Sequence, residues 1–327
     1  VLGMDLDPAR ARTVLDPNTL DPAGSTSIDW YVPSPDGKLV AVSLSRGGSE
    51  DGTLHLFDSA SGARVGEVIP HVNFATGCGG LAWNRDGSGF WYTRYPGEGR
   101  PEADRHFYVQ VYFHELGTDP SKDARVFGEG LPRIAEILLD YSHAADALLV
   151  SVQNGDGGDF SHWVSGRDGR FVQVTRWEDG VDFAAFGPDG ALYLVSEKNA
   201  PRRQILKLAP GVTDLARAVT IVPQGSDAIP ITFFNEDPLA FTSNRMYVRY
   251  MAGGPSRLQA FELDGKPAGE VPLPGVAAVN EFEAVGDDLV YRVETYLEPA
   301  RFHRLSGGRS MPTGLVVACQ AERSQHS

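Results

Sequence analysis

The chain has 327 residues, of which 42% are hydrophobic, and its formal net charge at pH 7 is −14. This length suits one large all-β domain or two average domains, and the acidic balance, without a long run of basic residues, argues against a nucleic-acid-binding surface. No apolar run approaches the ~18 residues that a membrane-spanning helix needs, so we expect no membrane partner.

A turn followed by a strand recurs along the chain. The first copy, SPDGKLVAVS from Ser34, joins an Asp-Gly pair typical of a tight hairpin turn to an alternating apolar run typical of a half-buried strand. Similar stretches begin at Asn84, Ser142, Gly187, Phe241 and Glu283. A period of roughly 50 residues is typical of a β-propeller blade with four antiparallel strands.

Each repeat also holds the other strands that a blade needs. An apolar strand precedes the turn, a third strand follows the main strand, and a more polar strand comes last. The stretches before the turn are SIDWYVP, GGLAWN, IAEILLDY, DFAAFG, ITFFNE and VNEFEAV. We therefore predict an all-β fold, a β-propeller of four-stranded antiparallel blades with six complete repeats.

The two ends of the chain do not complete this pattern. Ala11–Pro17 resembles a fourth strand without its first three, so it is counted as an orphan strand. The prediction is a propeller over residues 1–308 with a truncated first blade, and a tail of uncertain structure over residues 309–327. Within this tail Gly314–Cys319, GLVVAC, fits no blade position. Three interpretations stay open: it closes the ring, it is an artefact of the reading frame, or the exposed blade edges form a homodimer.

Several longer passages resemble the propeller domain of the prolyl oligopeptidase family of serine peptidases. They are VLDPNTLDP from Val14, LAWNRDGSGFWYTRYP from Leu81, YFHELGTDPSKDARVF from Tyr112 and EKNAPRRQILKL from Glu197. The resemblance implies a seven-bladed propeller that caps the active site of an α/β-hydrolase domain and admits only short peptides. It also implies a catalytic hydrolase domain and a peptide substrate as partners, and we expect this chain to lack that hydrolase domain.

Residues with nucleophilic chemistry give a weak pattern. None of the serines lies in G-x-S-x-G, the strand-to-helix turn that exposes the nucleophile of an α/β-hydrolase. Asp159, Ser161 and His162 form the most compact set of acid, nucleophile and base, but adjacent residues on a strand point to opposite faces. Peptidase activity is therefore not expected, and weak esterase activity at these residues is an alternative hypothesis.

The same stretch offers a partial metal pattern. Asn154, Asp156 and Asp159 resemble half of a calcium loop, but the regular spacing and the distal glutamate of such a loop are missing. A solvated hairpin loop is the default interpretation. Cys78 and Cys319 lie far apart and form no CxxC pair, so no disulfide framework, zinc site or cofactor is predicted.

Two tyrosines are candidate substrate contacts. The resemblance places Tyr92 and Tyr95, in FWYTRYP, where the family has an aromatic residue near the outer part of its peptide-binding site. A packed or rim aromatic is the alternative, because such residues are common in strands.

Three hypotheses about function follow. The first is a substrate-gating and binding module without peptidase activity of its own. The second is a free-standing propeller hydrolase, and the third is a protein-interaction platform. The start of the chain has no apolar signal segment, so we expect a cytoplasmic protein, or a secreted or periplasmic one from which a signal peptide has been removed.

Overall fold

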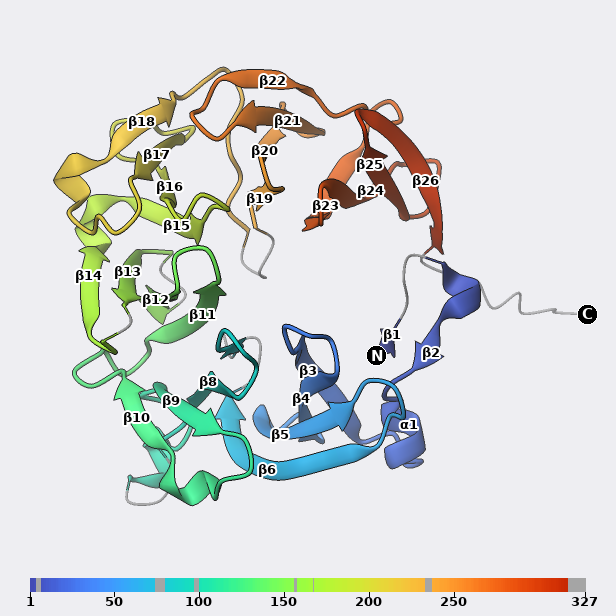
Figure 1. The fold of residues 1–327 in the computed structure, drawn as a ribbon, viewed down its shortest axis with the longest axis vertical. Helices are drawn as coiled ribbons and strands as arrows, with labels where there is room; N and C mark the ends of the chain where they lie inside the picture. Colours follow the sequence, from blue (N-terminus) through green and yellow to red (C-terminus); the bar gives the residue numbers. More distant parts are fainter. Residues whose placement is uncertain are drawn as a thin grey trace, which may run out of the picture. The chain divides into compact units, whose positions relative to one another are not determined.

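The computed structural model describes residues 1–3, 7–73, 80–96, 100–155, 158–166, 168–232 and 237–316. In these residues almost every regular element is a β-strand (Figure 1). The helical elements are α1 (Pro17–Leu20) and single-turn 3-10 helices at Pro8–Arg10, Glu102–Asp104, Pro120–Lys122, Trp177–Asp179 and Leu215–Arg217. Within this part of the chain, no helix has the length and apolar character needed to cross a bilayer.

The first two sets of four strands share one sheet. The first set is β3 (Thr26–Pro33), β4 (Leu39–Arg46), β5 (Asp51–Asp58) and β6 (Arg64–Asn73), and the second is β7 (Leu81–Trp83), β8 (Gly89–Arg94), β9 (Gln110–Glu115) and β10 (Ala124–Phe127). Consecutive strands of a set pair in the antiparallel sense. The two sets are joined where Val72 of β6 pairs with Arg94 of β8.

Four further sheets each hold four strands in chain order. These strands are β11 (Glu136–Ser142), β12 (Ala147–Gln153), β13 (Phe160–Ser165), β14 (Phe171–Thr175), β15 (Val181–Phe186), β16 (Leu192–Ser196), β17 (Gln204–Leu208), β18 (Val219–Val222), β19 (Leu239–Phe241), β20 (Arg245–Met251), β21 (Ser256–Glu262), β22 (Pro267–Glu270), β23 (Ala278–Val285), β24 (Asp288–Glu294), β25 (Arg301–Ser306) and β26 (Arg309–Val316). The predicted all-β fold of four-stranded antiparallel sheets is confirmed, and the number of blades stays a prediction.

The Asp-Gly turns close the first hairpin of a set through local hydrogen bonds. In the β3–β4 turn the Asp36 carboxylate accepts from the Ser34 hydroxyl at 2.8 Å and from the Lys38 N–H at 3.1 Å. Gly37 has a φ of +68°, in the left-handed region that favours glycine. The Ser34 N–H donates to the Leu39 carbonyl at 2.8 Å and completes the turn. The repeated sequence therefore encodes a repeated hairpin turn.

The strands of each set have two ends, which we call the tight edge and the long-loop edge after the connections that they carry. The tight edge carries the turns between the first and second strands, none longer than five residues. The long-loop edge carries the connections between the second and third strands, the longest of which is residues 95–109. Because consecutive strands run in opposite directions, these two kinds of connection lie at opposite ends of the strands.

The chain divides into two compact units, each with its own apolar core. Unit 1 comprises the described residues of Val1–Gly3, Arg12–Lys198 and Leu206–Val219, and the other described residues form unit 2. The cores are largest around the second strand of each set, and β4, β12, β16 and β20 are buried along most of their length. Such burial on both faces explains the nearly continuous apolar runs of these strands.

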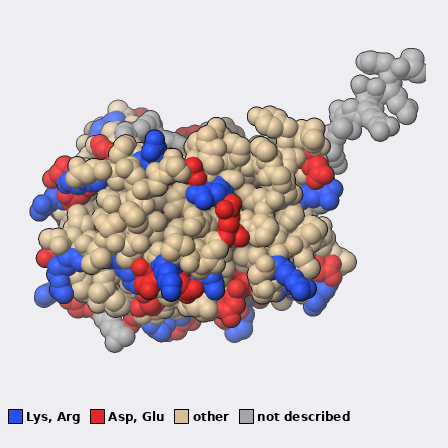
Figure 2. Space-filling view, turned by 90° about the horizontal axis from the view of Figure 1, so that it is seen from above, with Lys and Arg blue, Asp and Glu red and all other residues tan. Residues whose placement is uncertain are grey.

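Charged side chains of both signs are interspersed on one face of the molecule. On the face shown in Figure 2, lysine and arginine side chains lie among aspartate and glutamate side chains. A nucleic-acid-binding protein would instead gather basic side chains into a stripe or patch.

The C-terminal boundary differs from the prediction. Residues 309–316, assigned to a tail, form β26, which pairs with β25 as the fourth strand of the last set. Gly314 therefore lies within a strand. Pro312 and Gly314 are atypical of strand interiors, so the sequence did not predict a strand here. β26 is an edge strand, however, and proline is tolerated in edge strands. Residues 317–327, which include Cys319, lie outside the described residues.

Two other strands also differ from the sequence interpretation. In the fifth set, the described strand that precedes the 242–244 turn is β19, and Ile231 and Thr232 belong to no strand; residues 233–236 of the predicted stretch lie outside the described residues. The expected orphan strand is β2 (Arg12–Thr13), which pairs with β1 (Leu2–Gly3). Ring closure stays a prediction.

Candidate functional site

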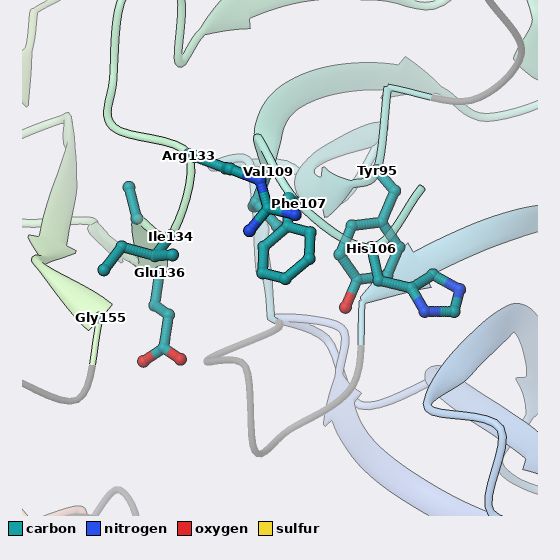
Figure 3. Close-up of a pocket in the computed structure, with 9 residues that line it drawn as sticks. Tyr95, His106, Phe107, Val109, Arg133, Ile134, Glu136 and Gly155 are labelled. Carbon is teal, nitrogen blue, oxygen red and sulfur yellow. The ribbon is translucent and has the colours of Figure 1, made fainter. Parts of the chain in front are cut away.

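A cavity of about 210 Å³ opens at the long-loop edge of the second and third sets, within unit 1 (Figure 3). Its wall comes from the 95–109 loop, the segment before β11, the first residue of β11 and the β12–β13 turn. The lining residues are Tyr95, His106, Phe107, Val109, Arg133, Ile134, Ala135, Glu136 and Gly155. The side chains shown in Figure 3 run from Glu136 on one side, past Phe107, to Tyr95 and His106 on the other.

One side of the cavity is aromatic. Tyr95 follows β8 directly, and its ring centroid lies 5.3 Å from that of His106. The Tyr95 N–H donates to the His71 carbonyl at 3.0 Å, which fixes the backbone at this point. The structure thus places the predicted candidate Tyr95 in a cavity wall, and its contact with a substrate stays a proposal.

Arg133 fastens the 95–109 loop to the segment before β11. Its Nε donates to Asp104 Oδ1 at 2.7 Å and its Nη2 donates to the Ala103 carbonyl at 2.7 Å. The guanidinium carbon lies 3.4 Å from the centroid of the Phe107 ring, a cation–π contact. A planar guanidinium can bond in its own plane and stack through its face at the same time, which a lysine ammonium cannot do.

Tyr108, next to these Arg133 contacts, has a strained backbone. Its φ is +59°, an unfavourable conformation for a bulky residue. Its N–H donates to the Arg133 carbonyl at 3.0 Å, and the Arg100 guanidinium lies 4.0 Å from the centroid of its ring. Strain of this kind costs on the order of 1–3 kcal/mol and is typical of functional sites.

The other side of the cavity depends on a glycine. Gly155, in the turn after β12, has a φ of +58°, and a Cβ placed there would lie 2.7 Å from Ile134 Cδ1. The absence of a side chain therefore lets Ile134 pack against the turn. Glu136, the first residue of β11, lines the cavity next to Ile134.

Tyr92 is in the core and not in the cavity. Its side chain is fully buried, and its hydroxyl donates to Asp123 Oδ2 at 2.8 Å. Burial raises the pKa of the Tyr92 hydroxyl. The same carboxylate holds His114, whose Nδ1 lies 3.0 Å from Asp123 Oδ1. We therefore do not retain Tyr92 as a substrate contact, because its position inside β8 directs it into the core. Tyr95 is also buried, but it lies beyond the strand and lines the cavity.

Asp159, Ser161 and His162 do not assemble into a triad. Ser161 and His162 are both buried on β13, and His162 Nδ1 lies 2.7 Å from Thr175 Oγ1. Burial lowers the pKa of His162 to about 3. Asp159 is exposed in the preceding turn, where its carbonyl accepts from the Asn154 N–H at 3.0 Å. Across the described chain, no hydrogen bond joins His162 to either of the other two.

Only two of the three residues of the predicted calcium pattern are among the described residues. Asn154 and Asp159 belong to the β12–β13 turn, and Asp156 lies outside the described residues. Among the residues that the structure describes, no group of three or more histidine, cysteine, aspartate or glutamate side chains could hold a metal ion. Cys78 is also outside them.

Comparison with known proteins identifies the family. Residues 4–309 match the family model described as the N-terminal beta-propeller domain of prolyl oligopeptidase. The chain belongs to this family. The resemblance seen in the sequence is thereby confirmed. Within the YFHELGTDPSKDARVF passage of this prolyl oligopeptidase propeller, His114 and Asp123 form the link described above.

The curated relatives of this propeller are considerably longer. A prolyl endopeptidase from Elizabethkingia meningoseptica is 26% identical over 302 residues, which cover 89% of this chain and 40% of the relative. Prolyl oligopeptidase A from Amanita bisporigera is 25% identical over 268 residues, 72% of this chain and 34% of the relative. The chain thus spans no more than about 40% of the length of these relatives.

Solved structures confirm the β-propeller fold. One comes from a structural and mechanistic analysis of two prolyl endopeptidases and has a TM-score of 0.81 with 24% identity, covering 93% of this chain and 44% of that one. Prolyl oligopeptidase B from Galerina marginata, bound to a 35mer hydrolysis and macrocyclization substrate, has a TM-score of 0.78 with 17% identity, covering 93% and 45%.

Proposed function

We propose that the chain is the substrate-gating and binding propeller of a prolyl oligopeptidase-like serine peptidase and acts together with a catalytic hydrolase domain. The observation that carries the proposal is membership of the propeller family over residues 4–309, beside relatives whose remaining length lies outside the match. In this arrangement the propeller forms one wall of the substrate chamber and restricts entry by size.

The cavity at the long-loop edge supports a role in peptide contact. Peptide-binding pockets combine rigid aromatic surfaces with a few polar groups that fix orientation. Tyr95 and Phe107 supply the aromatic surfaces, and Arg133 and Glu136 are the charged groups. The strained backbone at Tyr108 next to this wall is also typical of a binding site.

A binding experiment tests this function. Fluorescence anisotropy would compare a labelled short proline-containing peptide with the same sequence embedded in a folded protein. We expect the purified chain to bind the short peptide and to discriminate against the folded protein. Tyr95→Leu should weaken binding, whereas the matched control Tyr247→Leu, at a similarly buried tyrosine outside the cavity, should not. Absence of peptide binding would contradict the proposal.

A hydrolysis assay separates this function from the alternative of a free-standing hydrolase. A proline-reporter peptide and a short acyl ester would be assayed across every gel-filtration fraction. We expect no hydrolysis that follows the protein peak, because Ser161 and His162 are buried and not bonded to each other. Ester cleavage that follows the peak and is lost in Ser161→Ala would instead favour the hydrolase.

A homodimer is a second proposal, favoured by one observation in unit 2. Leu297 and its neighbour Tyr296 are almost completely exposed in the turn after β24, and the Thr295 hydroxyl accepts from the Leu297 N–H at 3.2 Å and so fixes the turn. β26 is also an edge strand, which can pair with a second copy. Light scattering over a range of concentrations should show a dimer that Tyr296→Ser combined with Leu297→Ser weakens. A monomer at every concentration would contradict the proposal.

A further inference from the structure

The β12–β13 turn contains the only Asn-Gly pair of the chain, Asn154–Gly155. An asparagine before glycine loses its side-chain amide readily, because glycine has no side chain that would keep its backbone nitrogen away from the asparagine Cγ. Each of the other seven asparagines precedes a residue with a side chain. By its sequence, this pair is therefore the position most open to deamidation.

The structure leaves both reacting groups of this pair without hydrogen bonds. Among the residues that the structure describes, none forms a hydrogen bond with the Asn154 side chain or with the Gly155 N–H. Asn154 is partly exposed, and Gly155 lines the cavity (Figure 3). The turn is closed instead through the Asn154 N–H, which donates to the Asp159 carbonyl at 3.0 Å. Hydrogen bonding therefore does not hold the Asn154 Cγ away from the Gly155 nitrogen.

The Asp-Gly turns of the chain are held differently. In five of them the aspartate carboxylate accepts a hydrogen bond, of 3.0–3.2 Å, from the N–H two residues further on. These aspartates are Asp36, Asp86, Asp168, Asp189 and Asp264. A carboxylate held in this way must release its bond before its carbon is attacked, and an ionised carboxylate is itself a poor electrophile. The same reaction is therefore disfavoured at these turns.

We propose that Asn154–Gly155 is a site of spontaneous deamidation in the folded protein. The Gly155 nitrogen forms a bond to the Asn154 Cγ, and the bond between Cγ and Nδ2 breaks. The N–H proton passes to solvent, and Nδ2 takes up a proton and leaves as ammonia. Water then adds to either carbonyl of the resulting five-membered succinimide, which opens to aspartate or to isoaspartate. The whole reaction consumes one water molecule and releases one ammonia.

The isoaspartate product changes the cavity wall. Its main chain runs through the former side-chain methylene, so the backbone before Gly155 becomes one methylene longer. Gly155 packs closely against the neighbouring segment, because a Cβ there would lie 2.7 Å from Ile134 Cδ1. We expect Gly155 to shift relative to Ile134 and peptide binding at the cavity to decline, an effect that rests on the proposed function.

Mass spectrometry of the whole chain tests the modification without any ligand. The native chain and the same chain unfolded in guanidinium chloride would be stored in a mildly alkaline buffer and mapped as proteolytic peptides over time. We expect Asn154 to lose its amide in the native chain at a rate within about tenfold of the unfolded rate. Asn84 is the internal control, because its Nδ2 donates to the Ser88 hydroxyl at 3.0 Å and its Oδ1 accepts from the Gly89 N–H at 3.2 Å.

A native rate that is more than about tenfold below the unfolded rate would show that the fold protects this bond, and it would overturn the proposal. Conversion of Asn84 as fast as Asn154 in the native chain would also overturn it, because the structure would then not select the site.

A binding arm follows the effect on the cavity. The peptide-binding capacity of the stored wild-type chain should fall in step with its isoaspartate fraction. Asn154→Gln, whose attack would need a six-membered ring that forms slowly, should keep its capacity on storage. Unchanged capacity in a fully converted chain would overturn the effect on the cavity. If the fresh chain binds no peptide, the proposed function fails, and the mass measurement still decides the modification.

Discussion

At the residue scale, Gly155 determines how closely the β12–β13 turn approaches the cavity. Gly155→Ala places a Cβ in a left-handed conformation and 2.7 Å from Ile134 Cδ1. We expect it to lower the free energy of unfolding by about 1–2 kcal/mol and to weaken peptide binding, since Ile134 must move. Urea denaturation and anisotropy would measure the two effects.

The matched control is Gly286→Ala. Gly286 also has a positive φ, +63°, but nothing lies within 4 Å of the position that a Cβ would take there. It should therefore share the conformational cost and leave binding unchanged. Equal effects of the two substitutions on peptide binding would show that the contact with Ile134 is unimportant.

His162 gives the protein a dependence on pH. Burial lowers its pKa to about 3, whereas a histidine in an unfolded chain has a pKa of ~6.5. Below the unfolded value, the unfolded state binds a proton that the folded state does not, so acidification favours unfolding. We expect this group to remove up to about 1.4 kcal/mol of stability per pH unit between these two values.

Urea denaturation in the upper part of this range, where carboxylates remain ionised, would measure the effect. His162→Leu replaces the imidazole with an apolar side chain of similar size that does not titrate. The stability of this variant should therefore depend less on pH than that of the wild-type chain. The same pH dependence in both proteins would contradict the assignment.

Individual site residues were predictable only where the sequence carried a family pattern. Tyr95 was found because FWYTRYP resembles a family passage, and the same pattern also drew attention to Tyr92, which is in the core. Arg133 had no signal, because its contacts are with a loop some thirty residues earlier in the chain. Only the folded sheet brings these segments together.

At the element scale, Arg133 holds the 95–109 loop by three different contacts. Arg133→Lys keeps the charge but loses the stack on Phe107 and one of the two hydrogen bonds. We expect faster amide hydrogen exchange over residues 102–108, with less than about 1 kcal/mol lost from global stability, since the ion pair is partly exposed.

Exchange measured by mass spectrometry would localise this change. The matched control is Arg125→Lys, because Arg125 forms an exposed ion pair with Glu129 on the same unit but outside the loop. Unchanged exchange over residues 102–108 in Arg133→Lys would show that the loop is held by other contacts.

Strands were predictable where a local turn accompanied them. The Asp-Gly turns marked the first hairpins because the turn and its hydrogen bonds involve only neighbouring residues, as at Ser34–Leu39. β26 was missed because its sequence, with Pro312 and Gly314, has weak strand propensity. Its place is fixed by pairing with β25, which is a tertiary effect.

At the scale of the whole molecule, the net charge of −14 should govern how fast a charged peptide arrives. A negative field attracts cationic peptides over distances that salt shortens. We expect the association rate of a short lysine-containing peptide to fall as salt is added, and the rate of the same peptide with norleucine in place of lysine to change little. Stopped-flow fluorescence would measure both.

The division of each set into a tight edge and a long-loop edge has a practical consequence for protein engineering. The turn between β3 and β4 is closed by its own hydrogen bonds, and it lies at the opposite end of the strands from the kind of loop that carries the cavity. A fluorescent label attached to the exposed Lys38 side chain in this turn should therefore report on the protein from the end of the strands opposite the proposed peptide contact.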